Sequence, residues 1–353
     1  MNTSVKSIPS NQIPAHNNIS SYHHPLPFAL EKGGHLPELR ITYQTFGQLN
    51  ADASNVVWVA HALTANANPL EWWPGLIGDN DLINPTEHFI VCANIIGSCY
   101  GTTGPRDFNP ETGERYLTEF PALTIRDITR AHDLLRRHLG LERIYLGIGG
   151  SMGGQQLLEW AIESPELFEK LCVVATGAKS TPWGIAFRAA QRMAMEADPS
   201  FFSASPNGGR KGAEAARAMA MISYRSRESY NTAQEDDNEA IRNFRADSYQ
   251  RYQGLKLSKR FDARTYYTLT QAMDTHNVGR GRGSAEEALQ QIKAKTLVLG
   301  IAGDLLFAND EQEHLAKYIP DAQLEIIPSL YGHDGFLIEA PAISKSLNTF
   351  LKH

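Results

Sequence analysis

Cysteine is scarce in this sequence, and its scarcity argues against two architectures. The 353 residues include only Cys92, Cys99 and Cys172, an odd number without a Cys-x-x-Cys pair. Neither a disulfide framework nor a zinc–thiolate site fits this pattern, so we expect no metal centre. Buried or free thiols are expected instead, which favours a reducing compartment. A cysteine nucleophile stays open, but no local motif supports one.

The chain also lacks a long apolar run, a signal peptide and a basic block. No apolar run is long enough to span a bilayer, and the N-terminus has no charged region followed by an apolar core. Lys and Arg number 33 against 39 Asp and Glu, a net charge of −6, so nucleic acid and anionic membranes are poor partners. We therefore expect a cytoplasmic globular protein that acts on small molecules.

What the sequence does have is a Gly-x-Ser-x-Gly motif between an apolar segment and a helical pattern. Residues 144–148 are apolar, residues 149–153 read Gly-Gly-Ser-Met-Gly, and apolar residues at helical spacing follow from Gln155. This context predicts a nucleophile elbow, a sharp turn that exposes the hydroxyl of Ser151. Side chains at Gly149 and Gly153 would clash there. The alternative is a glycine-rich turn in another α/β protein.

An aspartate and a histidine follow in the chain order of α/β-hydrolases. Asp304 comes just after the apolar segment 296–301, and His333 lies in the loop after segment 323–327. The order Ser, Asp, His with each residue at a strand end predicts a catalytic triad. In it, Ser151 would attack an acyl carbonyl, His333 would take the proton, and Asp304 would orient the imidazole.

The tetrahedral oxyanion of such a reaction needs two hydrogen-bond donors. One is expected from the backbone N–H of Met152, the residue after the nucleophile. The other is expected from the loop after an early strand, here the apolar segment 56–60. We nominate the backbone N–H of Leu63 in that loop.

Continuous apolar runs indicate a buried sheet. Segments 56–60 and 89–93 are typical of strands covered on both faces, whereas residues 40–47 alternate and predict an antiparallel strand. Residues 123–139 form an amphipathic pattern that predicts a helix. Strands that alternate with helices predict an α/β-hydrolase fold with a mostly parallel central sheet and helices on both faces.

Composition divides the chain into a tail, a core and an insertion. Residues 1–25 are rich in Asn, Ser, Pro and His and predict a flexible N-terminal tail. Residues 26–180 and 281–353 carry the strands of the core. Residues 181–280 are dominated by helix formers and predict a helical lid over the site, with a separate helical domain as the alternative. The run 279–283, Gly-Arg-Gly-Arg-Gly, is interpreted as a linker back to the core.

Several segments resemble the homoserine O-acetyltransferase family, and the similarity runs from about residue 25 to the C-terminus. They are His-Ala-Leu-Thr at 61–64, Gly-Ser-Cys-Tyr-Gly-Thr-Thr-Gly-Pro at 97–105, the elbow at 149–154, Gly-His-Asp-Gly-Phe-Leu at 332–337, and the lid segment 216–226. The segment 97–105 is specific, because ordinary esterases do not carry it.

This resemblance implies acetyl transfer from acetyl-CoA to the hydroxyl of L-homoserine in methionine biosynthesis, by a ping-pong route through acyl-Ser151. Acetyl-CoA would be a co-substrate, with no bound cofactor, and the protein would be a homodimer. The resemblance also implies that Arg217 and Tyr224 hold the homoserine carboxylate and that Asp334 faces its amino group. A guanidinium can donate two parallel hydrogen bonds to a carboxylate, and a carboxylate pairs with an ammonium.

Other functions fit the same residues. Succinyl-CoA is an alternative donor, although a dicarboxylate acyl group would require an extra cation that the sequence does not place. Serine or another alcohol is an alternative acceptor. A carboxylesterase would use the same triad with water, and a non-catalytic binding module is a further alternative. The loop 66–73 departs from the family pattern and bears on donor preference, and Gly303 stands where the family has serine.

Overall fold

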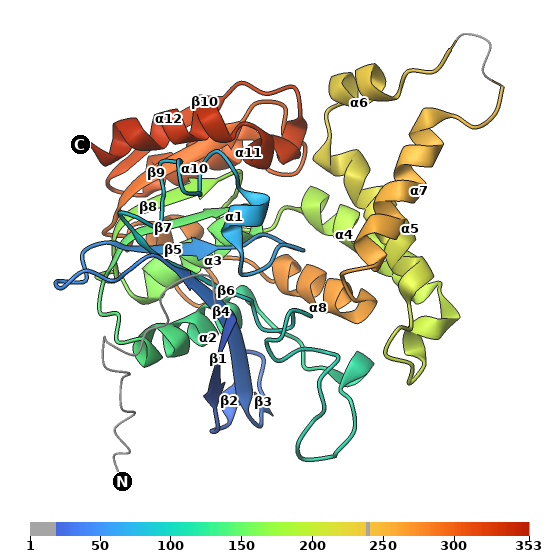
Figure 1. Ribbon diagram of the computed structural model, residues 1–353, viewed down its shortest axis with the longest axis horizontal. Coiled ribbons are helices and arrows are strands. Elements are labelled where there is room, and N and C mark those ends of the chain that lie inside the picture. The colour runs from blue at the N-terminus through green and yellow to red at the C-terminus, as the bar shows by residue number, and fades with distance from the viewer. Residues whose placement is uncertain (1–18, 238–240, 353) are drawn as a thin grey trace.

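One eight-stranded sheet forms the centre of the computed structural model, in the part of the chain that it describes, residues 19–237 and 241–352 (Figure 1). In spatial order the strands are β1 (Ile19–His24), β4 (Leu39–Phe46), β6 (Phe89–Ala93), β5 (Val56–Ala60), β7 (Ile144–Gly150), β8 (Phe168–Val174), β9 (Lys295–Ile301) and β10 (Ala322–Ile327). Strand β4 pairs antiparallel with β1 and β6, and the neighbouring pairs from β6 to β10 are parallel. The mostly parallel sheet predicted from the sequence is confirmed.

The edge strand β1 corrects the prediction of a flexible tail over residues 1–25. Residues 1–18 lie outside the described residues, but Ile19–His24 pair with Leu39–Gln44 of β4. Tyr22 is buried, and its ring stacks on His138 at 4.2 Å between centroids. Polar composition misled the prediction because an edge strand is held by backbone hydrogen bonds along one side, and its other residues face solvent. A small separate hairpin, β2 (Phe28–Ala29) with β3 (His35–Leu36), follows.

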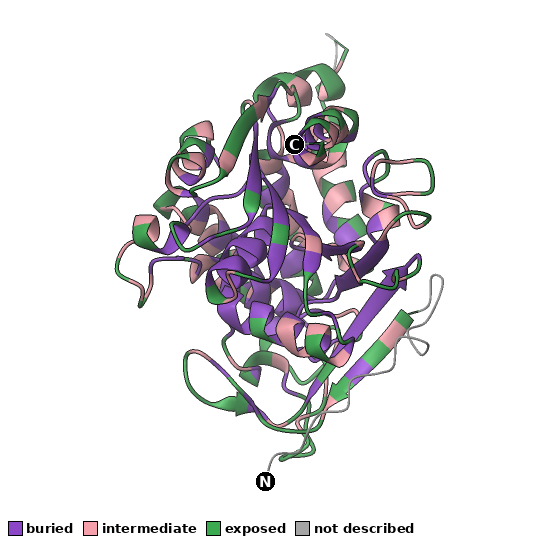
Figure 2. Ribbon diagram, turned by 90° about the vertical axis from the view of Figure 1, so that its left-hand side faces the viewer, coloured by how far each residue is buried: buried purple, intermediate pink, exposed green. Residues whose placement is uncertain are grey.

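Helices cover both faces of the sheet and enclose two apolar clusters, which appear as the buried centre of Figure 2. Within β5, Trp58 belongs to one cluster, and Val57 and Val59 belong to the other. The first face is covered by α2 (Ile125–His138), α3 (Met152–Glu163), α9 (Ala285–Leu289) and α10 (Asn309–Tyr318), and the second by α1 (Pro69–Trp72), α11 (Gly335–Ile338) and α12 (Ala340–Leu351). Strands buried on both faces explain the continuous apolar runs of the sequence.

The helical insertion lies between β8 and β9 and extends to one side of the sheet (Figure 1). It contains α4 (Pro182–Glu196), α5 (Arg210–Tyr224), α6 (Arg227–Gln234), α7 (Arg245–Ser258) and α8 (Ala263–Asp274), with a 3-10 turn at Pro199–Phe202. These helices fall where the sequence predicted a helical segment, residues 181–280. In the described residues, no helix is both long and apolar enough to cross a membrane.

A partly buried ion cluster, with Glu159 at its buried end, ties the end of the insertion to the core. Arg282 contacts the Glu159 carboxylate at 2.6 Å, and Arg280 contacts Glu31 at 2.8 Å. Arg126 of α2 bridges the two acids, at 3.1 Å from Glu159 and 2.9 Å from Glu31. The arginines of the run 279–283 therefore anchor the chain as it returns to the core, as expected for a linker.

Candidate active site

Ser151 stands at the sharp turn between β7 and α3. Its backbone has φ 54° and ψ −122°, a conformation that costs an L-residue free energy and persists only when neighbouring contacts hold it. Those contacts are present: the Ser151 N–H donates to the Val174 carbonyl at 2.9 Å, and the Thr176 hydroxyl donates to the Ser151 carbonyl at 3.0 Å. The strand–turn–helix predicted for the elbow is confirmed.

Glycines make this turn sterically possible. A Cβ atom on Gly149 would lie 2.8 Å from the backbone carbon of Gly153 and 2.9 Å from the Ala60 carbonyl oxygen. One on Gly153 would overlap the same Ala60 carbonyl. The clash that the sequence predicted for these two positions is therefore confirmed. Both added Cβ atoms would meet the carbonyl oxygen of Ala60, at the end of β5.

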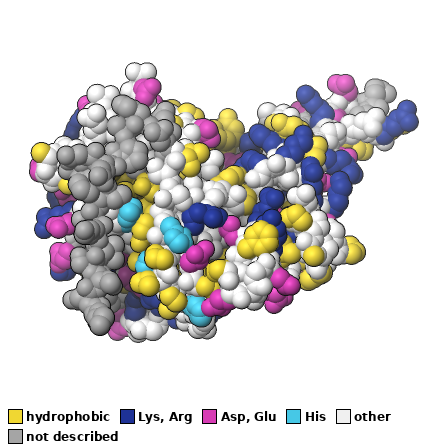
Figure 3. All heavy atoms as spheres, turned by 60° about the horizontal axis from the view of Figure 1, so that its bottom comes forward, with side chains coloured by type: hydrophobic (Ala, Val, Ile, Leu, Met, Phe, Trp, Pro, Cys, Tyr) yellow, Lys and Arg dark blue, Asp and Glu magenta, His cyan; other side chains and the backbone are white. Residues whose placement is uncertain are grey.

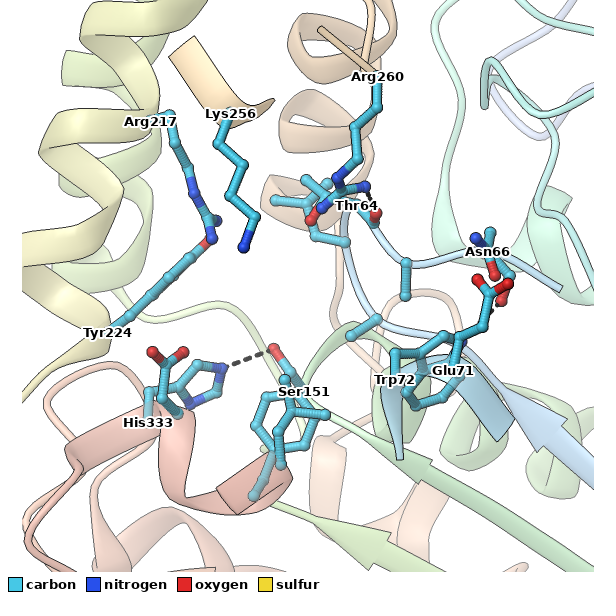
Figure 4. A pocket seen from close by; sticks show the side chains of 16 residues that line it. Thr64, Asn66, Glu71, Trp72, Ser151, Arg217, Tyr224, Lys256, Arg260 and His333 are labelled. Atoms are coloured by element: carbon cyan, nitrogen blue, oxygen red, sulfur yellow. Dashed lines mark hydrogen bonds between the residues drawn. The ribbon is translucent and has the colours of Figure 1, made fainter. Parts of the chain in front are cut away.

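The structure brings Ser151, Asp304 and His333 together from distant parts of the chain. His333 Nε2 lies 2.9 Å from Ser151 Oγ, as the dashed line in Figure 4 marks. His333 Nδ1 lies 2.6 Å from Asp304 Oδ2. All three residues are buried. The geometry is that of a nucleophile, a base and a group that orients the base.

Asp304 is fixed by the turn that follows β9. Its Oδ1 accepts hydrogen bonds from the backbone N–H groups of Leu306 at 2.7 Å and Phe307 at 3.1 Å. Oδ2 is therefore left for His333. Gly303 adopts φ +77° in this turn, a left-handed conformation that suits glycine, so the departure from serine at this position is compatible with the geometry.

The charge on Asp304 sets the proton affinity of His333. Burial lowers the pKa of the His333 imidazole, but the Asp304 carboxylate and its hydrogen bond raise the pKa by more, so the net shift is upward. The pair therefore stabilises the imidazolium that forms when His333 accepts a proton. Aromatic rings surround the imidazole, with centroids at 5.2 Å for Phe336, 5.5 Å for Phe307 and 5.8 Å for Tyr224.

Residues 61–67, which include Leu63, form a loop that is fixed to the elbow. The Gln156 side chain on α3 donates to the carbonyls of His61, at 3.0 Å, and Met152, at 3.1 Å. His61 Nε2 accepts from the Ile95 N–H at 3.2 Å, and burial lowers the pKa of His61 to about 4, so this ring is neutral. Leu63 and Ser151 border the same pocket.

The segment 97–105 supports the same loop from outside. Asn94 accepts a hydrogen bond from the Ala67 N–H at 2.8 Å and donates to the Tyr100 carbonyl at 2.9 Å. From the insertion, Arg260 donates to the Thr64 carbonyl and to the Tyr100 hydroxyl, both at 2.6 Å. The loop is thus held by the core and by the insertion together.

A cavity of about 440 Å³ opens above Ser151 and His333 (Figure 4). Its walls come from the loop after β5, from α1, from the insertion and from the loop that carries His333. The charged and aromatic residues that line it include Glu71, Trp72, Arg217, Tyr224, Lys256, Arg260 and Asp334. The cavity size suits a small-molecule ligand.

The three residues expected to hold the acceptor all border this cavity. The Arg217 guanidinium lies 5.1 Å from the centre of the Tyr224 ring, and within the described ranges it forms no ion pair. Asp334 is engaged by Arg225, at 2.7 Å, a partner that the sequence did not predict. Burial raises the pKa of the Asp334 carboxyl, and the cations Arg225 and Arg217 oppose that shift.

Lys256 and Arg260 are cavity residues that sequence reasoning missed. Both belong to the α7 region of the insertion, and Figure 4 shows Lys256 directed into the cavity beside Arg217. No motif surrounds either residue, so only the path of α7 reveals them. Arg225 could have been found, because it follows Tyr224 directly in the lid segment quoted for the family resemblance.

The three cysteines provide no competing nucleophile. All are free thiols, and Cys92 and Cys172 are buried in the core. Burial raises the pKa of both thiols, and it raises the pKa of Cys99 as well. A neutral thiol is a poor nucleophile, so the cysteine alternative loses support.

Comparison with known proteins agrees with this geometry. Residues 55–340 match the family model for the alpha/beta hydrolase fold. A homoserine O-acetyltransferase from Cyclobacterium marinum is 48% identical over 322 residues, which cover 91% of this chain and 92% of that protein. The chain belongs to the homoserine O-acetyltransferase family.

Solved structures show that this fold serves more than one reaction. A homoserine O-acetyltransferase from Bacillus anthracis superposes with a TM-score of 0.86 at 23% identity, over 96% of this chain and 99% of that one. An acetylester hydrolase from Corynebacterium glutamicum superposes with a TM-score of 0.85 at 25% identity, over 95% and 96%. The fold therefore does not distinguish a family member that transfers acetyl from a hydrolase, and only the residues of the site can do so.

Proposed function

We propose that this protein transfers the acetyl group of acetyl-CoA to the hydroxyl of L-homoserine, which gives O-acetyl-L-homoserine for methionine biosynthesis. The observation that carries the proposal is one cavity that contains both the Ser151–His333 pair and the Arg217, Tyr224 and Asp334 side chains. Membership of the homoserine O-acetyltransferase family supports the same reaction. A plain esterase, whose acceptor is water, has no need for Arg217, Tyr224 and Asp334 in its cavity.

In the first half-reaction, Ser151 Oγ attacks the thioester carbonyl while His333 Nε2 takes the hydroxyl proton. The N–H groups of Leu63 and Met152 stabilise the oxyanion. The intermediate then collapses, the carbon–sulfur bond breaks, and His333 returns the proton to the CoA sulfur. Acetyl-Ser151 and free CoA remain.

In the second half-reaction, His333 accepts the proton of the homoserine hydroxyl as that oxygen attacks the acetyl ester. Ser151 leaves and regains the proton from His333. Asp304 stabilises the imidazolium in both steps, which accords with the raised pKa of His333. The triad supplies the acid and base, so the reaction needs neither a metal nor a bound cofactor, and acetyl-CoA is a co-substrate.

The acceptor is held by complementary charges. Arg217, with Tyr224 beside it, binds the homoserine carboxylate, and Asp334 faces the amino group. Arg225 contacts one Asp334 oxygen, Oδ2, which leaves the other oxygen for an ammonium. Water has neither charged group, so these residues favour homoserine over hydrolysis.

The donor approaches through a positively charged surface. The insertion, residues 181–280, contains 15 Lys and Arg and 11 Asp and Glu, a net charge of +4 in a chain of net charge −6. Figure 3 shows many Lys and Arg side chains gathered on this part of the molecule. Lys256 and Arg260 at the cavity suit the phosphate groups of acetyl-CoA.

We also propose a cytoplasmic homodimer that pairs through the insertion. Large apolar side chains are exposed on it: Met193, Phe202, Met219, Ile222, Ile241, Phe244, Tyr252 and Leu255. Exposed apolar surface of this extent is typical of an interface. Light scattering after size exclusion measures the mass, and a monomer at micromolar concentration would contradict this part.

A thiol-release assay tests the reaction. The protein is incubated with acetyl-CoA or succinyl-CoA, with and without L-homoserine or L-serine, and free CoA is measured. We expect rapid release only with acetyl-CoA and homoserine together, and none from Ser151→Ala. CoA release at the same rate with and without the amino acid would contradict acyl transfer and indicate hydrolysis. Rapid release with succinyl-CoA would reassign the donor, and rapid release with serine would reassign the acceptor.

A further inference from the structure

A second, smaller cavity borders Ser151 on the side of the insertion. Its volume is about 30 Å³, and it shares Leu63, Ser151 and Tyr224 with the larger cavity. Of the seven remaining described residues that line it, four are apolar, namely Phe187 of α4, Met273 of α8, and Leu306 and Phe307 of the turn after β9, and the other three are Arg188, Gln191 and Ser223. No step of the proposed reaction uses these apolar residues.

A ping-pong reaction needs two separate spaces at the nucleophile. The acyl group stays on Ser151 while CoA leaves and the acceptor enters. The larger cavity contains Arg217, Tyr224 and Asp334 and must be free for the acceptor. The acyl chain therefore requires another space that reaches the same hydroxyl, and the smaller cavity does so.

Volume limits what the smaller cavity can hold. A space of about 30 Å³ takes roughly one or two non-hydrogen atoms, because a single water requires about 10–15 Å³ on this measure. The methyl group of an acetyl ester fits. A succinyl group adds a second methylene and a carboxylate, which exceed the space.

Charge gives a second reason against a dicarboxylate. Arg188 borders the cavity, but its guanidinium is already engaged, with Nε 2.5 Å from Asp274 Oδ1 and Nη2 donating to Ser180 Oγ at 3.0 Å. Among the described residues, Arg188 is the only cation in the lining, and a buried carboxylate without a cation free to pair with it is strongly disfavoured.

We propose that this second cavity is the acyl subsite, which holds the methyl group of acetyl-Ser151, and that Met273 and Phe187 set the length of the acyl chain. The inference rests on the proposed covalent intermediate, but not on the identity of the acceptor. Each methylene that fits or fails to fit a pocket changes specificity by roughly 10- to 200-fold. The cavity wall therefore determines the choice of donor.

The test is the acyl-length profile of the wild type, Met273→Ala and Phe187→Ala. The probes are p-nitrophenyl acetate, propionate and butyrate, whose nitrophenol release reports acylation of Ser151 without homoserine. We expect the wild type to prefer acetate and both variants to raise the butyrate-to-acetate ratio of kcat/KM about tenfold or more. Acetyl-, butyryl- and succinyl-CoA with homoserine form a second panel, in which butyryl transfer rises in the variants and succinyl transfer does not.

Met195→Ala is the matched control, because Met195 is buried in the same insertion and does not line the cavity. Its profile should equal that of the wild type, and circular dichroism checks the fold of every variant. Phe187 is only partly buried, so its variant remains informative if Met273→Ala unfolds. Unchanged ratios in folded variants would overturn the acyl subsite. A shifted ester profile without any homoserine dependence would instead overturn the proposed acceptor and leave the subsite standing.

Discussion

At the scale of single residues, the strained backbone of Ser151 is what aims the hydroxyl at His333. Val174 and Thr176 hold that backbone, and Asp304 holds the imidazole in turn. Ser151 and His333 are thus each fixed by partners that are themselves buried or hydrogen-bonded. A catalytic group fixed in this way loses little free energy to reorganisation during the reaction.

The pH profile should report the Asp304–His333 pair. His333 acts as a base only when neutral, and Asp304 raises its pKa, so kcat/KM should rise with pH through a midpoint above the ordinary histidine value near 6.5. Asp304→Asn removes the charge, so its remaining activity should have a midpoint at lower pH. We also expect a fall in kcat of about 10³- to 10⁴-fold. Equal midpoints in the two profiles would contradict the pairing.

Arg217→Ala should weaken the use of homoserine selectively. A hydrogen bond to a charged group contributes about 1.5–3 kcal/mol, so kcat/KM for homoserine should fall roughly 10- to 150-fold. The acylation of Ser151 by p-nitrophenyl acetate should remain within about twofold of the wild type. Arg217→Lys should recover part of the loss, because it keeps the positive charge but cannot donate two parallel hydrogen bonds to the carboxylate. If acylation fell as much as transfer, Arg217 would have a structural role instead.

At the scale of elements, the insertion is attached to the core at both the site and its far end. Arg260 contacts the loop after β5, and the Ser226 hydroxyl of the insertion donates to the Leu330 carbonyl in the loop before His333. Arg282 contacts Glu159 where the chain returns to the core. These contacts fix α5 and α7, and therefore Arg217 and Lys256, relative to Ser151.

Removing the charge of Glu159 should destabilise the protein. Its side chain is 1% exposed and lies against Arg126 and Arg282. Glu159→Gln keeps the shape but removes the nearest anion of Arg282 and one of the two anions of Arg126, which keeps Glu31, and this loss should cost about 1.5–3 kcal/mol in the free energy of unfolding. Chemical denaturation measures this change. Glu166→Gln, which breaks an exposed pair with Lys293, is the control and should leave the denaturation midpoint almost unchanged.

At the scale of the whole molecule, charge is distributed unequally. The insertion is positive, whereas the rest of the chain is negative enough to bring the total to −6. A polyanionic donor is therefore attracted to the side of the molecule where the cavity opens. Such attraction acts over about 10 Å and weakens as salt is added.

Lys256→Glu should raise the KM for acetyl-CoA several-fold while it changes the KM for homoserine less, because it places a negative charge where phosphates approach. The wild-type KM for acetyl-CoA should also rise with ionic strength, and the variant should show less of this dependence. Lys345→Glu on α12 makes the same charge change away from the cavity and is the control. Equal effects of the two substitutions would show that only net charge matters.

The sequence by itself determined the chemistry at the reacting centre. Ser151, Asp304 and His333 could be found because each lies in the turn or loop that follows a strand, and parallel strands bring their ends to one edge of the sheet. The glycines of the elbow could be found for a similar reason, since their requirement is local. The roles of Leu63 and Met152 as oxyanion donors stay predictions.

Only the tertiary structure decided what surrounds that centre. Lys256 and Arg260 reach the cavity because α7 packs against α5, and no local pattern encodes that packing. The second cavity arises where α4, α8 and the turn after β9 meet. Strand β1 forms because β4 offers an unpaired edge to a polar segment. Short-range periodicity records which face of an element is buried, but the size and charge of a cavity depend on contacts between elements that are distant in the chain.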